Sequence, residues 1–312
     1  MIYLVTGAAG FIGSNLVEAL VKQGESVRAV DNFSTGKKEN LAPFLDVIDF
    51  IEGDVRDEAL CRNLCEGADV VLHQAALGSV PRSIDDPLNT DANNATGTLN
   101  MMVAAKDAEV GRFVYASSSS VYGDTVELPK HEAMPLSPRS PYAVTKAMAE
   151  MYGKVFFDVY GLHTVGLRYF NVFGPRQDAA SGYAAVIPKF VKALLEGDAP
   201  VIFGDGEQTR DFTYIDNVVQ ANLKAAVAPA SACGQAYNVG CGERISVNAL
   251  FAQIAQGLGL SVEAQYQDPR PGDVRDSLAS IEKIQKNLDY KPEVMSAEGI
   301  ARSIDWYRDA LV

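Results

Sequence analysis

A tyrosine and a lysine four residues apart, Tyr142 and Lys146, form the pair in this chain whose types and spacing most directly suggest catalysis. Residues i and i+4 of a helix share a face, and Pro141 stands where the first helical turn tolerates proline. A phenol has a pKa of about 10, too high for a base at neutral pH, but a nearby ammonium group stabilises the phenolate and lowers that pKa. The pair therefore predicts a tyrosine that acts as a base, with an ordinary surface pair as the alternative.

Four consecutive serines, residues 117–120, come before this helix and directly after the strand-like segment Arg112–Ala116. A flexible serine linker does not fit, because strong strand formers flank the run on both sides. Open α/β sheets bind ligands at the carboxyl ends of their strands. We therefore expect these serines at a strand end, near the tyrosine–lysine pair.

The elements that would position such a site begin at the N-terminus. Ile2–Val5 fits a short buried strand, and a helical pattern of apolar residues follows over 16–21. Gly7, Gly10 and Gly13 stand between them, where glycines allow a sharp turn, a close approach to a pyrophosphate and tight helix packing. The free N–H groups of the helix end favour phosphate. This order predicts a dinucleotide-binding loop rather than a turn without a ligand.

An acidic residue, Asp31, follows the second apolar segment, Ser26–Val30, at the distance where a carboxylate meets the ribose hydroxyls of adenosine. A carboxylate at this place favours NAD and repels the 2′-phosphate of NADP. The loop over residues 32–36 is expected to surround the adenosine. Asp54 and Val55 follow a third strand, Val47–Ile51, where they either meet the adenine or cap the next helix.

Two further segments are candidates for contact with the cofactor. Small residues in His73–Ala76, after the strand Val70–Leu72, would let a cofactor lie against the sheet edge, with His73 itself packed. One long helix is predicted over Asn89–Asp107, and Asn94 within it either faces the cofactor or caps a helix.

Strands and helices alternate as far as the segment Thr164–Arg168 and become irregular after it. Such alternation predicts an α/β fold, a Rossmann doubly wound parallel sheet, with a smaller α/β lobe that binds the substrate. Residues 1–170 are assigned to the NAD-binding domain, with returns near 214–240. Residues 171–213 and 246–312 are assigned mainly to the substrate lobe.

The composition narrows the class of protein. A net charge of −13 over 312 residues argues against nucleic-acid binding, which needs clustered basic residues. No stretch is apolar enough to span a membrane, and the chain starts on a strand without a basic signal region, so we expect a cytoplasmic protein. The four cysteines and three isolated histidines form no ligand set, so we expect no metal site.

Together, the motifs resemble those of the extended short-chain dehydrogenase/reductases, and among them the nucleotide-sugar 4-epimerases. The resemblance covers almost the whole chain and is closest to the UDP-N-acetylglucosamine 4-epimerase group, to which the segment Gly78–Ser83 is also similar. It rests on the glycine loop, Asp31, Asp54-Val55, His73–Ala76, the serine run with Val121–Gly123, Tyr142, Lys146, Arg168–Asn171, Arg210–Phe212 and Arg270–Asp273.

The resemblance implies roles for individual residues. The catalytic residues would be Ser118, Tyr142 and Lys146. The NAD-binding residues would be Gly7, Gly10, Phe11, Ile12, Gly13, Asp31, Asn32, Ser34, Thr35, Gly36, Asp54, Val55, Gln74, Ala75, Ala76, Asn94, Tyr142, Lys146 and Phe170. The UDP-sugar would be bound by Gly78, Ser79, Ser118, Ser119, Ser120, Tyr142, Asn171, Val186, Val201, Phe203, Arg210, Arg270, Asp273 and Ser277. A homodimer is also implied, in which helices around residues 94–107 and 142–158 form a four-helix bundle.

The implied reaction is NAD-dependent 4-epimerisation of a UDP-hexose through a 4-keto intermediate. Ser277 and Gly78 favour UDP-GlcNAc and UDP-GalNAc, because relatives restricted to UDP-glucose tend to carry tyrosine and lysine at these places. A serine leaves room for an acetamido group and offers it a hydroxyl. UDP-Glc and UDP-Gal would be equal or poorer substrates.

Three alternatives remain open. A UDP-glucuronate 4-epimerase is the nearest, since it shares the serine-rich strand end. A 4,6-dehydratase or a decarboxylase would need an acidic residue where this chain carries Ser119 and Ser120. A non-catalytic NAD-binding regulator is disfavoured because Ser118, Tyr142 and Lys146 are all present.

Overall fold

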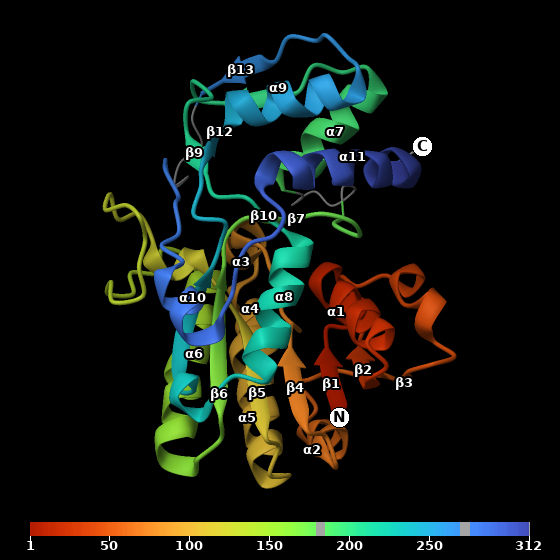
Figure 1. Ribbon diagram of the computed structural model, residues 1–312, viewed down its shortest axis with the longest axis vertical. Coiled ribbons are helices and arrows are strands. Elements are labelled where there is room, and N and C mark those ends of the chain that lie inside the picture. The colour runs from red at the N-terminus through yellow and green to blue at the C-terminus, as the bar shows by residue number, and fades with distance from the viewer. Residues whose placement is uncertain (179–184, 269–274, 312) are drawn as a thin grey trace.

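A sheet of seven parallel strands forms the centre of the computed structural model, which describes residues 1–178, 185–268 and 275–311 (Figure 1). The strand order is β11-β6-β5-β4-β1-β2-β3, and each neighbouring pair is parallel. The strands are β1 (Ile2–Thr6), β2 (Ser26–Asp31), β3 (Asp49–Glu52), β4 (Val70–His73), β5 (Arg112–Ser118), β6 (Thr164–Tyr169) and β11 (Gln235–Val239). The Rossmann sheet predicted from the sequence is confirmed.

Helices cover both faces of this sheet, which explains why the central strands β1 and β4 carry buried apolar side chains on both faces. Successive side chains of a strand point to opposite faces. Val5 of β1 packs in one core with α1 (Phe11–Lys22) and α8 (Ile215–Ala226). Leu4, one residue earlier, packs in a second core with α2 (Glu58–Cys65), α5 (Gly97–Asp107) and α6 (Pro141–Tyr160).

The later part of the chain builds a layer beyond the carboxyl ends of the strands, in the upper half of Figure 1. Its helices are α7 (Val186–Glu196), α9 (Val247–Leu258) and α11 (Ser296–Leu311). Short strands pair within it: β8 (Val201–Phe203) with β13 (Gln265–Gln267), β7 (Val172–Phe173) with β10 (Thr213–Tyr214), and β9 (Thr209–Arg210) with β12 (Ile245–Ser246). Helix α10 (Glu282–Leu288) returns to pack against β11 of the central sheet. The division of the chain into two lobes stays a prediction.

The helix predicted over residues 89–107 is interrupted. It consists of α4 (Pro87–Asp91), a π-helical turn over Ala92–Thr96 and α5, and it follows the short helix α3 (Val80–Asp85). Asn94 lies in the wide turn, where its side chain accepts a hydrogen bond from the backbone N–H of Leu77 at 2.7 Å and donates one to the carbonyl oxygen of Leu77. Such π-turns are frequent at functional sites, and this one faces the segment after β4.

Within the described ranges, no helix is both long enough and apolar enough to cross a membrane. The same ranges contain no group of three or more His, Cys, Asp or Glu side chains arranged to hold a metal ion. The four cysteines are buried free thiols. The cytoplasmic location stays a prediction.

Candidate active site

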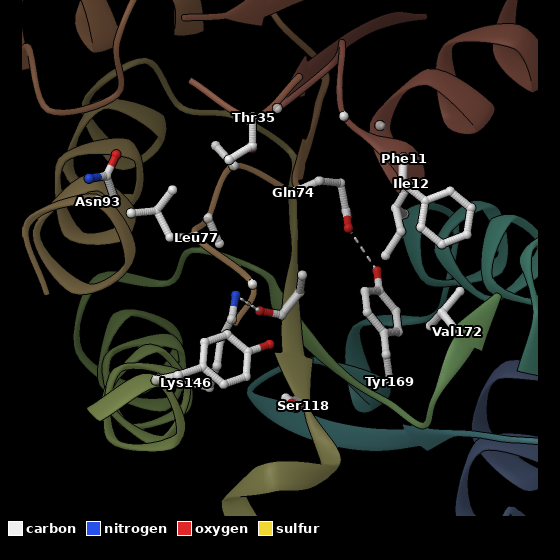
Figure 2. A pocket seen from close by; sticks show the side chains of 18 of the residues that line it. Phe11, Ile12, Thr35, Gln74, Leu77, Asn93, Ser118, Lys146, Tyr169 and Val172 are labelled. Atoms are coloured by element: carbon white, nitrogen blue, oxygen red, sulfur yellow. Dashed lines mark hydrogen bonds between the residues drawn. The ribbon is translucent and has the colours of Figure 1, made fainter. Parts of the chain in front are cut away.

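A cavity of about 560 Å³ lies at the carboxyl ends of the central strands (Figure 2). Segments that follow six different strands line it. Of the residues proposed from the sequence, those on its wall are Gly7, Gly10, Phe11, Ile12, Gly13, Asp31, Asn32, Ser34, Thr35, Val55, Gln74, Ala75, Ala76, Gly78, Ser118, Ser119, Ser120, Tyr142, Lys146 and Asn171. The structure thus brings the glycine loop and the tyrosine–lysine pair together in one cavity.

The glycine loop forms one end of the cavity. Gly7 has a φ of +64°, and a Cβ on it would lie 2.8 Å from the Cα of Ala75. A Cβ on Gly13 would lie 2.1 Å from the carbonyl oxygen of Gly7, so side chains are excluded at both places. Helix α1 starts after Gly10, which makes no side-chain cap. The first N–H groups of a helix have no partner within it, so this end suits a phosphate.

Asp31 is held rigidly beside the glycine loop. Its two carboxylate oxygens accept hydrogen bonds from the backbone N–H groups of Ala9, at 2.9 Å, and Phe33, at 2.7 Å. Burial raises the pKa of Asp31, and these hydrogen bonds oppose that rise. Gly36 supports the same arrangement from behind, because a Cβ on it would lie 2.9 Å from Asp31 Oδ1.

Tyr142 and Lys146 project from α6, whose first turn is capped by Ser140. Lys146 is buried and Tyr142 is partly buried, and burial lowers the pKa of Lys146 to about 8. Lys146 Nζ donates a hydrogen bond to the carbonyl oxygen of Ala116 at 2.8 Å and lies 5.9 Å from the ring centre of Tyr142. Burial raises the pKa of Tyr142, while a hydrogen bond with Ser118 lowers it. The expected lowering by Lys146 is therefore wrong for this geometry, because burial outweighs the other effects on the phenol.

The serine run ends β5 and turns directly into the cavity. Ser118 Oγ accepts a hydrogen bond from the N–H of Ser120 at 3.2 Å, which starts the 3₁₀ turn Ser119–Tyr122. Ser120 Oγ is buried and has no hydrogen-bond partner among the described residues. A buried hydroxyl without a partner on a cavity wall is suited to bind a polar ligand.

A second cavity, of about 290 Å³, opens beside the first and shares Asn171 and Val172 with it. It brings together three distant elements of the upper layer, α7, β8 and β9. The residues proposed for the UDP-sugar that line it are Asn171, Val186, Val201, Phe203 and Arg210. Two other proposed residues, Arg270 and Asp273, lie outside the described residues.

Among the residues that the structure describes, six of those proposed lie on neither cavity wall. Gly36 lies against Asp31, and Asn94 hydrogen-bonds to Leu77, and both of these partners are wall residues. Asp54 instead pairs with Arg56 at 2.6 Å, and this hydrogen bond lowers its pKa to about 2. Asp57, not Asp54, caps α2. The remaining three are Ser79, which caps α3, Phe170, which is fully buried in a core, and Ser277, whose N–H donates to the carbonyl oxygen of Thr209.

Several residues on the wall of the first cavity were not predicted from the sequence. They are Val30, Gly53, Leu77, Val80, Asn93, Ala116, Ser117, Tyr169 and Val172. Tyr169 faces the cavity opposite Lys146, and its hydroxyl donates to Gln74 Oε1 at 3.0 Å (Figure 2). It also shares a hydrogen bond with Asn222 of α8. The position of Tyr169 at the end of β6 could have indicated that it lines the site, but nothing in the sequence indicated its hydrogen-bond partners.

Known proteins share both the sequence and the fold of this chain. The model of the NAD dependent epimerase/dehydratase family matches residues 3–240. A UDP-glucose 4-epimerase of Mycolicibacterium smegmatis is 41% identical over 310 residues, which cover 98% of each chain. The structure of a UDP-N-acetylglucosamine 4-epimerase from Methanobrevibacter ruminantium M1, in complex with UDP-N-acetylmuramic acid, superimposes with a TM-score of 0.94 at 41% identity, over 99% of this chain and 98% of that one. A UDP-glucose 4-epimerase from Thermotoga maritima, with UDP-glucose, has a TM-score of 0.95 at 37% identity over 100% of both chains.

Proposed function

Since this chain belongs to the NAD-dependent epimerase/dehydratase family, we propose that it interconverts UDP-GlcNAc and UDP-GalNAc by epimerisation at C4. One observation carries the proposal: a single cavity has a dinucleotide-type glycine loop at one end and Ser118, Tyr142 and Lys146 at the other. NAD in this cavity would supply the acceptor, and later the donor, of the C4 hydride. Because the reaction has no net redox change, the cofactor has to stay bound throughout.

The wall residues fit NAD. The glycine loop leaves its backbone open to a pyrophosphate, because side chains at Gly7 or Gly13 would collide with neighbouring backbone. Asp31 is fixed by two backbone N–H groups and places a carboxylate where a 2′-phosphate would be repelled. These contacts support NAD over NADP.

The catalytic residues are suited to proton transfer. Tyr142 would take the proton of the 4-hydroxyl while the C4–H bond breaks, and return it to the 4-keto oxygen after the sugar has turned over. Of the neighbouring groups, Ser118 is the one whose hydrogen bond lowers the pKa of Tyr142. With a pKa of about 8, Lys146 is mostly protonated at neutral pH and supplies positive charge to the site.

The second cavity is where we place the UDP group. Its walls combine apolar side chains, among them Val186 and Phe203, with the guanidinium of Arg210. Apolar walls suit a pyrimidine ring, and a guanidinium suits a diphosphate through paired hydrogen bonds. The shared residue Asn171 lies where the two cavities meet, so a nucleotide sugar can extend from one to the other.

Space beside Gly78 supports an N-acetylated sugar. Gly78 lines the first cavity, and a Cβ on it would meet no atom within 4 Å, so this wall is open. Ser277 lines neither cavity, so its position does not favour a direct contact with the acetamido group. We therefore assign the acetamido group primarily to the Gly78 side.

Product analysis tests the substrate. Purified protein is incubated separately with UDP-GlcNAc, UDP-Glc and UDP-glucuronate, without added NAD, and the products are identified by NMR. We expect UDP-GalNAc, formed with a kcat/KM at least equal to that for UDP-Glc. Faster turnover of UDP-glucuronate would overturn the substrate in favour of the uronate. A 4-keto-6-deoxy product would overturn epimerisation in favour of dehydration.

Substitution of the two small residues sharpens the test. Gly78→Lys is expected to lower turnover of UDP-GlcNAc more than that of UDP-Glc, because added bulk on the wall of the first cavity excludes the larger sugar. Ser277→Tyr, at a residue that lines neither cavity, is expected to change this ratio less. Ser277→Ala, which adds no bulk, is the control and should leave the ratio unchanged. If both bulky variants keep the wild-type ratio, the acetamido group is bound elsewhere.

We also propose a homodimer formed mainly through α6. The side chains of Val144, Met151, Val155 and Val159 are exposed along this helix, Met151 to 61%. Leu88 of α4, 83% exposed, belongs to a helix that packs beside α6. Helix α5 exposes less apolar surface for a dimer contact, since its Leu99 and Val103 pack against a core. Sedimentation should show a dimer that Met151→Glu converts to monomer and that Lys154→Gln, on the same helix, leaves intact.

A further inference from the structure

We propose that a buried ion pair between Arg168 of β6 and Glu150 of α6 is a positioning unit for the reacting groups. It fixes the strand end that carries Ser118 against the helix that carries Tyr142 and Lys146. This inference rests on the proposed epimerase function. Neither Arg168 nor Glu150 lines either of the two cavities, so neither side chain is placed to touch the ligands.

The pair is two-pronged and shielded from water. Arg168 Nε donates to Glu150 Oε1 at 2.8 Å, and its Nη2 donates to Oε2 at 2.6 Å. The two side chains are only 6% and 8% exposed. Ser117, the residue next to Ser118, donates from its Oγ to Glu150 Oε1 at 2.5 Å. The carboxylate therefore binds both β5 and β6 from its place on α6.

The guanidinium extends the contact to the serine turn. Arg168 Nη1 donates to the hydroxyl oxygen of Tyr122 at 2.7 Å, and that hydroxyl donates to Asn238 Oδ1 at 2.6 Å. Tyr122 ends the 3₁₀ turn that carries Ser119 and Ser120. Burial raises the pKa of Tyr122 to about 12, so it stays a hydrogen-bond donor. Burial opposes the charge on Arg168, but its bonds to Glu150 outweigh this and raise its pKa.

The spacing links the pair to the site. Tyr142, Lys146 and Glu150 are successive i, i+4 positions on α6 and form one row that faces the sheet. In the sheet register, Ser117 is opposite Arg168 and Ser118 is opposite Tyr169. The pair thus holds β5 through Ser117, one residue from Ser118, and it holds α6 through Glu150, one helical turn from Lys146.

Stability alone does not account for such a pair. Buried ion pairs often contribute no more than apolar side chains of similar volume, because taking both charges out of water costs as much as their attraction gains. Their geometry is nevertheless strict, and a displacement of about 1 Å at a reacting group can cost roughly 100-fold in rate. The pair is therefore expected to affect kcat more than folding.

Three variants test this. Arg168→Lys keeps the charge but loses the fork, and Arg168→Met with Glu150→Met removes both charges at similar volume. Arg112→Met is the matched control: Arg112 is also buried, at the other end of β5, where it binds the carbonyl oxygens of Ala225 and Ala228. The kcat and KM for UDP-GlcNAc, the NAD content and the Tm are measured for each.

We expect both Arg168 variants to fold, to keep NAD and to lose about ten-fold or more in kcat, with KM changed less than about three-fold. The Arg112 variant should lose Tm but keep kcat. A double-methionine variant with the kcat of the wild type would overturn the proposal, and so would a loss of kcat that only follows the loss of Tm in all three variants.

Amide hydrogen exchange separates this proposal from the proposed function, because it needs no turnover. Exchange over residues 117–122 and 141–150 should be faster in Arg168→Lys than in the wild type, and unchanged there in Arg112→Met. Unchanged exchange in Arg168→Lys would overturn the positioning role. Faster exchange in that variant, in a protein whose wild type turns over no UDP-sugar, would support the positioning role and overturn the epimerase.

Discussion

Lys146 donates a hydrogen bond from Nζ to the backbone carbonyl oxygen of Ala116, at 2.8 Å, and so joins α6 to β5 two residues before Ser118. The bond uses one of the three N–H donors of the ammonium group and leaves two for ligands. Lys146 is thereby held in place by the sheet. In the proposed reaction Lys146 holds positive charge and hydrogen-bond donors at the site, while Ser118 acts on Tyr142 directly.

Removal of the phenol hydroxyl is the direct test of the base. Tyr142→Phe should lower kcat by about 10²–10⁴-fold, because a positioned general base contributes on this scale. NAD content should be unchanged. Tyr160→Phe, on the same helix but 55% exposed, is the control and should keep full activity. Wild-type turnover by Tyr142→Phe would remove this residue from the mechanism.

A side chain on Gly13 should disrupt the cofactor loop. A Cβ there would lie 2.1 Å from the carbonyl oxygen of Gly7, and backbone cannot yield as a flexible side chain does. We expect Gly13→Ala to lower both the Tm and the NAD that copurifies, as measured by nucleotide release on denaturation. Gly111→Ala is the control, since its Cβ would approach the nearest atom, the carbonyl oxygen of Asp69, only to 3.3 Å.

Asp31→Asn tests the adenosine end. The carboxylate accepts from two backbone N–H groups, those of Ala9 and Phe33, but an amide offers only one oxygen. An unsatisfied buried donor costs about 1–3 kcal/mol. The variant should therefore lose NAD during dialysis and discriminate less against NADP, which titration calorimetry on cofactor-depleted protein would show. Unchanged NAD retention and selectivity would place the ribose elsewhere.

His73 should make stability depend on pH in the acid range. Burial, with the nearby charge of Lys146, lowers its pKa to about 3, and its ring nitrogens contact the hydroxyls of Thr6 and Thr98. Below the unfolded pKa of about 6.5 the unfolded chain binds the proton and the folded chain does not, so stability falls as the pH drops from about 6.5 to 3.

The slope contributed by His73 is at most ~1.4 kcal/mol per pH unit. His73→Asn keeps a polar side chain but cannot titrate, so its unfolding free energy should vary less with pH across this window, as measured by urea denaturation. Equal slopes for variant and wild type would mean that His73 is protonated in the folded chain.

Much of the fold followed from local patterns. Short apolar runs, a glycine turn and alternating helices are read within a few residues of the chain, so the strands and the dinucleotide loop were predictable. The π-turn at Asn94 was not, because it depends on hydrogen bonds to Leu77, seventeen positions away in the chain. The cap of α2, by contrast, is local: Asp57 stands directly before Glu58, and its carboxylate accepts from the N–H of Leu60.

Only those site residues that belong to short sequence motifs were predictable from the sequence. Tyr142, Lys146 and Ser118 stand in short recognisable segments, and the structure brings them to one wall. Tyr169 and its partner Gln74 meet across ninety-five positions of the chain, a relation that no local pattern encodes. The balance of effects on the pKa of Tyr142 was mispredicted for the same reason, since burial is a property of the folded molecule.

The most direct test of the epimerase mechanism uses UDP-GlcNAc labelled with deuterium at C4. The purified protein is given this substrate with no added NAD, and the product is examined by mass spectrometry and NMR. The epimerase mechanism predicts UDP-GalNAc that keeps its deuterium at C4, because the hydride leaves and returns through a cofactor that stays bound. A product that carries solvent hydrogen at C4, or no product from protein that contains NAD, would contradict it.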